Sequence, residues 1–190
     1  MWNLIRTAIL LLVVITGLTG FIYPLAVTGL AQLFFPHQAN GSLIRIDDHQ
    51  RASELIGQPF SDPKYFWGRP SATLLWSYNA ASSAGSNLGP TNPALKEAVG
   101  KRVAALRQAD PSNRLPVPVD LVTTSGSGLD PHISPAAALY QVPRVARARG
   151  LDEKKVADLV RRNICDRQFG LFGEPTVHVL HLNMALDALH

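Results

Sequence analysis

The pattern of hydrophobic positions divides the chain into one continuous apolar run and a longer, mixed remainder. No residue is charged from Thr7 to Phe35, and most are Leu, Ile, Val, Ala, Gly or Phe. A bilayer core about 30 Å thick is crossed by roughly 20 helical residues, so this run is long enough to span a membrane. The pattern predicts a transmembrane anchor helix over residues 1–35, kinked at Pro24 because proline removes a backbone donor.

A cleavable signal peptide is the alternative interpretation, because Gly29 and Ala31 imitate a small-x-small cleavage site. The apolar run before them is longer than the roughly 7–15 residues of such a signal, which favours an anchor. Arg6 lies on the N-terminal flank, and no further charge appears until Arg45. Because positive flanks stay in the cytoplasm, we expect a single-pass protein of the inner membrane, with a cytoplasmic N-terminus and an extracytoplasmic main domain.

Residues 36–190 mix helical and alternating patterns, which predicts a single compact α+β domain with a small sheet and several helices. Two N-cap residues, Asn92 and Ser134, each precede a proline in a first helical turn. The predicted helices cover 93–108, 134–149 with a break or kink at Pro143, a segment from the cap Asp152 to Ile164, and 184–189. A turn is expected over 37–42, extended segments over 43–46, 117–124 and 176–182, and a short further element over 54–58, stopped by Pro59.

The stretch from Phe60 to Pro93 predicts little regular structure, since it is rich in Pro, Gly, Ser and Asn. Irregular stretches of this length inside a compact domain are often functional. Its aromatic residues indicate that it is held against the domain: Tyr65, Phe66, Trp67, Trp76 and Tyr78.

The net charge of +4 is dispersed along the chain. No basic run with interleaved aromatics is present, so nucleic acid is not an expected partner. Segment 144–167 is richer in Arg and Lys, which predicts either solvated helix faces or a surface for an acidic partner or anionic membrane lipids. The single cysteine, Cys165, permits no intrachain disulfide, and its helical surroundings predict a buried small hydrophobe.

Residues 124–133 contain a Ser-Gly-Ser-Gly loop with acidic and histidine side chains behind it. A membrane-anchored hydrolase would use Ser125 or Ser127 as nucleophile, His132 as base and Asp130 to orient that base. The spacing does not favour this chemistry, because a G-x-S-x-G elbow needs a glycine two residues away on each side of the serine. A shaped structural or docking loop is the other interpretation.

Candidate contacts with partner proteins come from the anchor and from the loops. Small residues one helical turn apart let a second transmembrane helix approach closely, although glycine is also common in membrane helices without such a role. In the anchor the candidates are Thr16, Gly17, Gly20 and Pro24. In the loops they are Asn87, Gly89, Ser125, Gly126, Ser127, Gly128, Asp130 and His132.

Neither a phosphate site nor a metal site is predicted by the spacing of residues. The glycine-rich loop lacks the G-x-x-x-x-G-K-[ST] pattern and contains no lysine, so unaided nucleotide binding is not expected. His178 and His181 are the one close histidine pair, and a strand would place them on opposite faces. No zinc site follows. An independent extracytoplasmic ligand-binding module stays open as a third functional class.

Short motifs along nearly the whole chain, in one order, are similar to those of a known family. They are Tyr23-Pro24-Leu25 with Thr28-Gly29, Gln38 to Ser42, Leu55 to Gln58, Tyr65-Phe66, Arg69 to Ala72, Ser86 to Pro93, Asp120 to Thr123, Ser134-Pro135, Gln141, Arg144 to Ala146, Gly173 to Pro175, and Leu182 to Leu186. Together they resemble the C subunit of Kdp, the high-affinity potassium-transporting P-type ATPase of bacteria and archaea.

The resemblance implies a non-catalytic accessory subunit with one membrane helix and an extracytoplasmic domain. Its implied partners are a channel-like potassium-binding subunit, a P-type ATP-hydrolysing subunit and a small single-helix subunit. ATP, magnesium and potassium would be used by the complex, with no cofactor bound by this chain alone. The family is assigned a catalytic-chaperone role that raises the ATP affinity of the pump subunit, and Gln141 matches the glutamine implicated in that role.

The implied role of Gln141 conflicts with the predicted topology, because ATP is cytoplasmic and Gln141 is expected outside. A folded domain keeps the side that it takes at insertion, whereas coupling between distant sites is ordinary in proteins. We therefore expect the domain to cover the outer mouth of the channel-like subunit, where it supports assembly or shapes ion entry.

Overall fold

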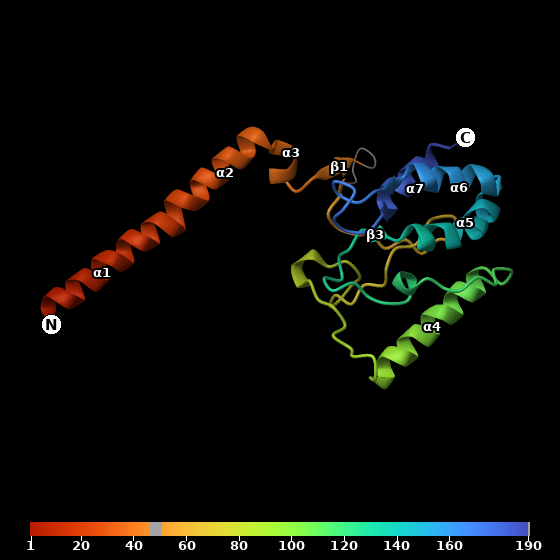
Figure 1. Ribbon diagram of the computed structural model, residues 1–190, viewed down its shortest axis with the longest axis horizontal. Helices are drawn as coiled ribbons and strands as arrows, with labels where there is room; N and C mark the ends of the chain where they lie inside the picture. The colour runs from red at the N-terminus through yellow and green to blue at the C-terminus, as the bar shows by residue number, and fades with distance from the viewer. Residues whose placement is uncertain (46–50, 190) are drawn as a thin grey trace. The chain divides into compact units, whose positions relative to one another are not determined.

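The structure, a computed structural model, describes residues 1–45 and 51–189 (Figure 1). The chain consists of two compact units, Met1–Ser53 and Glu54–His190. The first carries the apolar helix and a short hairpin, and the second combines helices with a small antiparallel sheet. This confirms the predicted α+β class with an N-terminal apolar helix. The predicted division into an anchor over residues 1–35 and a domain over residues 36–190 stays a prediction.

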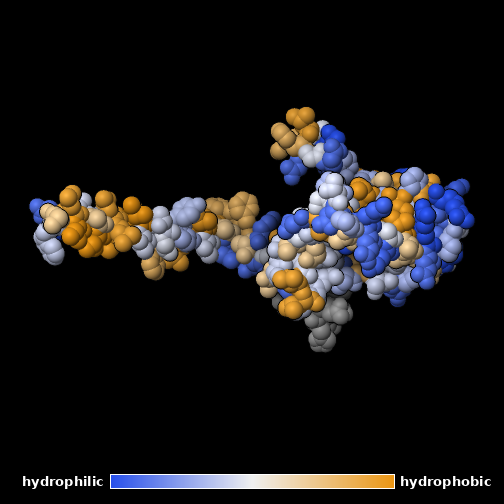
Figure 2. Space-filling model, turned by 90° about the horizontal axis from the view of Figure 1, so that it is seen from below, coloured by the Kyte–Doolittle hydropathy of each residue, from blue (hydrophilic) through white to orange (hydrophobic). Residues whose placement is uncertain are grey.

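The apolar run forms α1 (Trp2–Gly17), the π-helical turn η1 (Leu18–Ile22) and α2 (Tyr23–Phe34). The combined helix has 33 residues, its most apolar 18-residue window has a mean hydropathy of 2.2, and it is long and apolar enough to cross a membrane. Figure 2 shows mostly apolar side chains along it. The π turn lies directly before Pro24, whose ring would clash with the carbonyl four residues earlier in a regular α-helix. The distortion predicted at Pro24 therefore takes the form of a widened turn.

The first unit continues with α3 (Pro36–Ala39), β1 (Leu43–Arg45) and β2 (Arg51–Ser53). The turn predicted over 37–42 is wrong in its first half, because Pro36 begins a helical turn. The strand predicted over 43–46 is confirmed as far as Arg45, and Ile46 lies outside the described residues. The element predicted over 54–58 is also wrong. The second strand is β2, which pairs antiparallel with β1 (Leu43 opposite Ser53) and ends just before residue 54.

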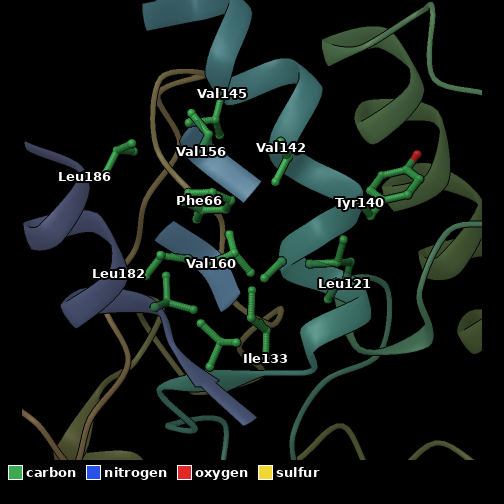
Figure 3. Packing of buried hydrophobic residues seen from close by; sticks show 14 of the residues in the cluster. Phe66, Leu121, Ile133, Tyr140, Val142, Val145, Val156, Val160, Leu182 and Leu186 are labelled. Atoms are coloured by element: carbon green, nitrogen blue, oxygen red, sulfur yellow. The ribbon is translucent and has the colours of Figure 1, made fainter. Parts of the chain in front are cut away.

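The core of the second unit is built by a three-stranded sheet and three helices. The sheet has the order β3 (His132–Ile133), β5 (Thr176–His178) and β4 (Ile164–Cys165), with both pairs antiparallel. The helices are α5 (Pro135–Arg149), α6 (Glu153–Arg162) and α7 (Val179–Asp187). Figure 3 shows apolar side chains from these elements converging, among them Val145, Val156, Val160, Leu182 and Leu186. Phe66, from the irregular stretch, is completely buried in the same cluster.

Capping chemistry confirms the helices predicted from sequence. The side chains of Asn92, Ser134 and Asp152 each accept a backbone N–H at the start of α4 (Pro93–Ala109), α5 and α6. Gly150 ends α5 with φ 66°, a left-handed conformation that glycine adopts without a Cβ clash. The stretch 60–93 is irregular as predicted, apart from the 3₁₀ turn η2 (Ala80–Ser82).

Two extended segments predicted from sequence fold otherwise. Segment 117–124 contains the 3₁₀ turn η3 (Val119–Leu121) and no strand, because its prolines cannot donate to a ladder. The strand predicted over 176–182 ends at His178. The His178 side chain accepts the backbone N–H of His181 and starts α7, so this helix begins well before the predicted residue 184.

Three predictions about α5, α6 and the following strand also need correction. Of the break or kink predicted at Pro143, the break is wrong, because α5 continues through this residue. The helix capped by Asp152 ends at Arg162, and Ile164 belongs to β4. Cys165 is exposed rather than buried, because β4 lies at an edge of the sheet and its half-buried position is taken by Ile164.

Candidate functional site

Two amide side chains hold the backbone of the irregular stretch against the helices, and we call Gln141 and Asn183 the amide clamp. Asn183 of α7 pairs with both polar groups of Phe66: the Phe66 N–H donates to Oδ1 over 2.9 Å, and Nδ2 donates to the Phe66 carbonyl over 3.0 Å. Gln141 of α5 does the same for Trp67, with distances of 2.8 and 3.1 Å. Each amide thus supplies the backbone hydrogen bonds that a neighbouring strand would otherwise provide to an extended segment.

Arg144 extends the amide clamp along α5. Its Nη2 donates to Gln141 Oε1 over 2.6 Å, and its Nη1 donates to the carbonyls of Pro63 and Tyr65. The guanidinium lies 4.1 Å from the centroid of the Trp67 ring, a cation–π geometry. Burial lowers the pKa of Arg144 to about 10, opposed by nearby carboxylates. The group is therefore still charged at neutral pH, and it depends on these partners for its solvation.

Gln141 uses its whole hydrogen-bonding capacity inside the domain. An amide side chain has two donor hydrogens and two acceptor lone pairs. Oε1 accepts from Trp67 N–H and Arg144, and Nε2 donates to the carbonyls of Trp67 and Ala137. Only 1% of the residue is exposed. No part of the side chain is available to a ligand in this conformation, and the nucleotide-related role that the resemblance implies stays a prediction.

The loop considered for hydrolase chemistry brings Asp130 and His132 together. Asp130 Oδ1 lies 3.4 Å from His132 Nδ1, and Oδ2 lies 3.2 Å from Arg69 Nη1. Burial raises the Asp130 pKa, but hydrogen bonds from His132 and Arg69 outweigh this effect, so the pKa lies below its ordinary value. Ser127 Oγ instead accepts the backbone N–H of Leu129 over 3.1 Å. Within the described residues no hydrogen bond joins Ser127 to His132, and the pair that activates a serine is missing.

The carbonyls of this loop are used to lock it against the irregular stretch. Ser127 O accepts from Ala84 N–H over 2.9 Å, and Gly128 O accepts from Ser71 Oγ over 2.7 Å. Leu129 O accepts from Gly57 N–H over 2.8 Å. Consecutive carbonyls therefore bind three separate segments, which favours the structural interpretation of the loop over a catalytic one.

The remaining candidate contacts lie mainly at the surface. Asn87, Gly89, Gly126 and Ser127 are exposed, whereas Ser125 and Gly128 are buried. In the anchor Thr16, Gly20 and Pro24 are exposed and Gly17 is partly so. A Cβ on Gly20 would lie 3.9 Å from Thr16 Cγ2, so these two residues share a helix face as predicted. Whether any of them contacts a partner stays a prediction.

The prediction that His178 and His181 lie on opposite faces is wrong. Their rings stack with centroids 4.1 Å apart, and the His132 ring meets His178 edge-on at 5.0 Å. Helix α7 starts between the two residues and turns His181 back over His178. In residues 1–45 and 51–189, no group of three or more His, Cys, Asp or Glu side chains has the arrangement of a metal site.

The environment of His178 leads us to expect that the domain loses stability at mildly acidic pH. Nδ1 of His178 accepts from His181 N–H, so Nε2 carries the proton and donates to Glu54 O over 2.7 Å. Burial lowers the pKa of His178 below its ordinary value, opposed by the bond to Glu54. The neutral ring therefore stabilises the fold fully at pH values above the histidine pKa of the unfolded chain, about 6.5. This contribution is lost as the pH falls through the pKa of His178 in the folded domain.

Urea denaturation of the full chain should show this loss between about pH 8 and pH 5, with about 1 kcal/mol coming from the helix cap alone. His178→Asn keeps a capping side chain without a proton to gain in this range. It should flatten the pH dependence, and an unchanged slope in the variant would refute the assignment to His178.

Comparison with known proteins identifies the family of the chain. The family model described as "K+-transporting ATPase, c chain" matches residues 5–188. Among similar curated proteins, the potassium-transporting ATPase KdpC subunit of Methylococcus capsulatus is 64% identical over 189 residues, covering 100% of both chains. Those of Sorangium cellulosum and Polaromonas naphthalenivorans are 64% and 62% identical, and each covers at least 96% of both chains. The chain belongs to the KdpC family, the c chains of potassium-transporting ATPases.

Proposed function

We propose that this chain is a non-catalytic accessory subunit that supports the assembly and stability of an ATP-driven potassium-uptake complex. Its partners in this proposal are a channel-like potassium-binding subunit, a P-type ATP-hydrolysing subunit and a small single-helix subunit. Family membership supports the complex, and the apolar helix from Trp2 to Phe34 supports attachment to a membrane. ATP, magnesium and potassium are used by the partner subunits.

The observation that carries the accessory role is the saturated amide of Gln141. This residue is the one that the resemblance connects with nucleotide, yet all four of its hydrogen-bonding positions are taken by Trp67, Ala137 and Arg144. Binding a nucleotide here would first require breaking the amide clamp. Any effect of Gln141 on ATP affinity is therefore better explained by the shape of the domain, transmitted through contacts between subunits.

The second unit occupies the extracytoplasmic side in this proposal and covers the outer mouth of the channel-like subunit. The support is the charge pattern at the anchor, with Arg6 near the start of the helix, just before the uncharged run, and no other charge until Arg45. On that side the domain has no access to cytoplasmic ATP, which agrees with the buried position of Gln141.

Cysteine labelling in cells tests the placement. Leu139 lies on α5 two residues before Gln141 and is 38% exposed, so a Leu139→Cys thiol is open to reagent while the amide clamp stays intact. The exposed native thiol of Cys165 is first removed as Cys165→Ser. A maleimide that passes the outer membrane but not the inner one should modify Leu139→Cys in intact cells. The matched control Asn3→Cys should react only after the inner membrane is opened.

The reverse labelling pattern would refute the proposed topology. Labelling is repeated on cells that produce this chain without its partner subunits, so that coverage of Leu139 in the complex is not mistaken for a cytoplasmic position. Cys165 in the otherwise native chain provides a second, independent position on the same unit, because β4 leaves it exposed.

A further inference from the structure

The irregular stretch ends in a tip of three large apolar side chains that face solvent. Leu74, Leu75 and Trp76 are 67, 88 and 61% exposed, and we call these three residues the apolar tip. Isolated apolar residues on a surface are common, but three large neighbours at one tip indicate an interaction site.

The apolar tip is held in place by a polar network beneath it. Thr73 Oγ1 donates to the carbonyl of Trp76 over 2.7 Å, and Asn79 Nδ2 donates to the carbonyl of Leu74 over 3.1 Å. Asn79 is almost completely buried. Ser71 Oγ lies 2.9 Å from Thr73 Oγ1 and connects this network to Gly128. The side chains of the tip are thus presented on a fixed backbone, which reduces the ordering entropy of docking.

Leu75 adopts a backbone conformation that does not suit leucine. Its φ is 70°, in the left-handed region that favours glycine and asparagine. The chain therefore places a large apolar side chain at the most exposed position of the tip, where a small or polar residue would fit the backbone better. Strain of this kind is often found in ligand clamps and active sites.

A hollow of about 380 Å³ adjoins the base of the tip. Its walls include the aromatic residues Phe60, Trp67 and Tyr78 together with Pro59 and Pro70. Tyr78 is fixed by a 2.6 Å hydrogen bond to the Arg69 carbonyl, and burial raises its pKa to about 12. Arg69, which also lines the hollow, has a buried Nε without a hydrogen-bond partner in the described residues.

The apolar tip lies within an uncharged stretch of the chain. No charged residue occurs from Pro70 to Leu95, and the nearest one before it, Arg69, is paired with Asp130. Loops that bind anionic lipid rely on clustered Lys and Arg, which are missing here. Depletion of charge around an aromatic anchor is instead typical of the core of a protein–protein interface.

We propose that the apolar tip and the adjoining hollow form a docking surface for an uncharged, apolar surface of another subunit of the same transporter. This inference rests on the proposed function, because it requires the chain to work within a complex. The tip inserts into the partner, and an apolar segment of the partner occupies the hollow, whose walls include aromatic and proline side chains.

The test uses two tip variants and one matched control in the full-length chain. Leu75→Asn suits the left-handed backbone and should raise the Tm of the chain in detergent by about 2–4 °C. Trp76→Ala removes the aromatic anchor. The control is Leu115→Asn, at an exposed apolar residue (59%) flanked by Arg114 and Pro116. It should leave Tm close to that of the unmodified chain. A tag on this chain is then used to co-purify the other subunits.

Both tip variants should reduce co-purification of the other subunits about tenfold or more, while Leu115→Asn retains them. A more stable Leu75→Asn chain that assembles less well would separate docking from folding. If the tip variants assemble normally, the docking surface is refuted and the proposed function stands. If the unmodified chain brings no other subunit, the proposed function fails as well. Quenching by brominated lipid of the fluorescence that comes from Trp76, measured as the difference between the unmodified chain and Trp76→Ala, would assign the tip to the bilayer and overturn the proposal.

Discussion

Replacing Gln141 by Leu will lower the free energy of unfolding by about 3–5 kcal/mol, the largest effect that we expect from a single side chain of similar size. The substitution leaves three groups without partners: the part-buried N–H and carbonyl of Trp67 and one buried N–H of Arg144. Each unsatisfied buried group costs about 1–3 kcal/mol, and more for a charged one. Urea denaturation of the full-length chain, followed by tryptophan fluorescence, measures the loss.

Two further variants separate the hydrogen bonds from other causes. Gln141→Glu keeps an acceptor for Trp67 N–H and Arg144 but loses the donor to the Trp67 carbonyl, so we expect a smaller loss of stability. Gln108→Leu is the matched control, because Gln108 is exposed on α4 and its replacement should change stability by less than about 0.5 kcal/mol.

The Gln141 variants also distinguish a structural role from a nucleotide-binding one. If Gln141 acts through the fold, the loss of ATP affinity in the assembled complex will be larger for Gln141→Leu than for Gln141→Glu, in the same order as their losses of domain stability. A Gln141→Leu chain that unfolds like the unmodified protein, while the complex loses ATP affinity, would contradict the role of the amide clamp.

Sequence patterns were reliable where the deciding interactions are local. The apolar helix and the starts of α4, α5 and α6 depend on length, hydropathy and caps only a few residues away, and the structure has all of them. The alternation over 176–182 misled because a single cap at His178 ends the strand and begins α7. Cys165 was misplaced for a related reason, since the helix before it stops two residues early.

The site was much less predictable, because its contacts join residues far apart in the chain. Gln141 pairs with Trp67 across 74 positions, and Asn183 pairs with Phe66 across 117. No periodicity indicates that an amide side chain will take the place of a strand. A partial signal was present in the aromatic residues of the irregular stretch, which suggested that it is held against the domain, but not by which side chains.

The glycine-rich loop gives a second prediction with a matched control only two residues away. Gly128 has φ 69°, and a Cβ there would lie 2.5 Å from the Ala84 carbonyl oxygen and 2.8 Å from Thr73 Cγ2. Ala84 belongs to the segment that the loop locks, so the backbone cannot move without breaking the contacts of Ser127 and Gly128. At Gly126 the φ angle is not positive, and a Cβ would meet no atom within 4 Å.

Gly128→Ala should therefore destabilise the domain by about 2–4 kcal/mol, combining left-handed strain with overpacking, whereas Gly126→Ala should be close to neutral. Urea denaturation of both full-length variants checks the difference. Because the network beneath the apolar tip reaches Gly128 through Ser71, the same substitution should also weaken co-purification of other subunits. Equal stability of the two variants would mean that the loop adapts freely, and the interlocked arrangement that presents the tip would then be wrong.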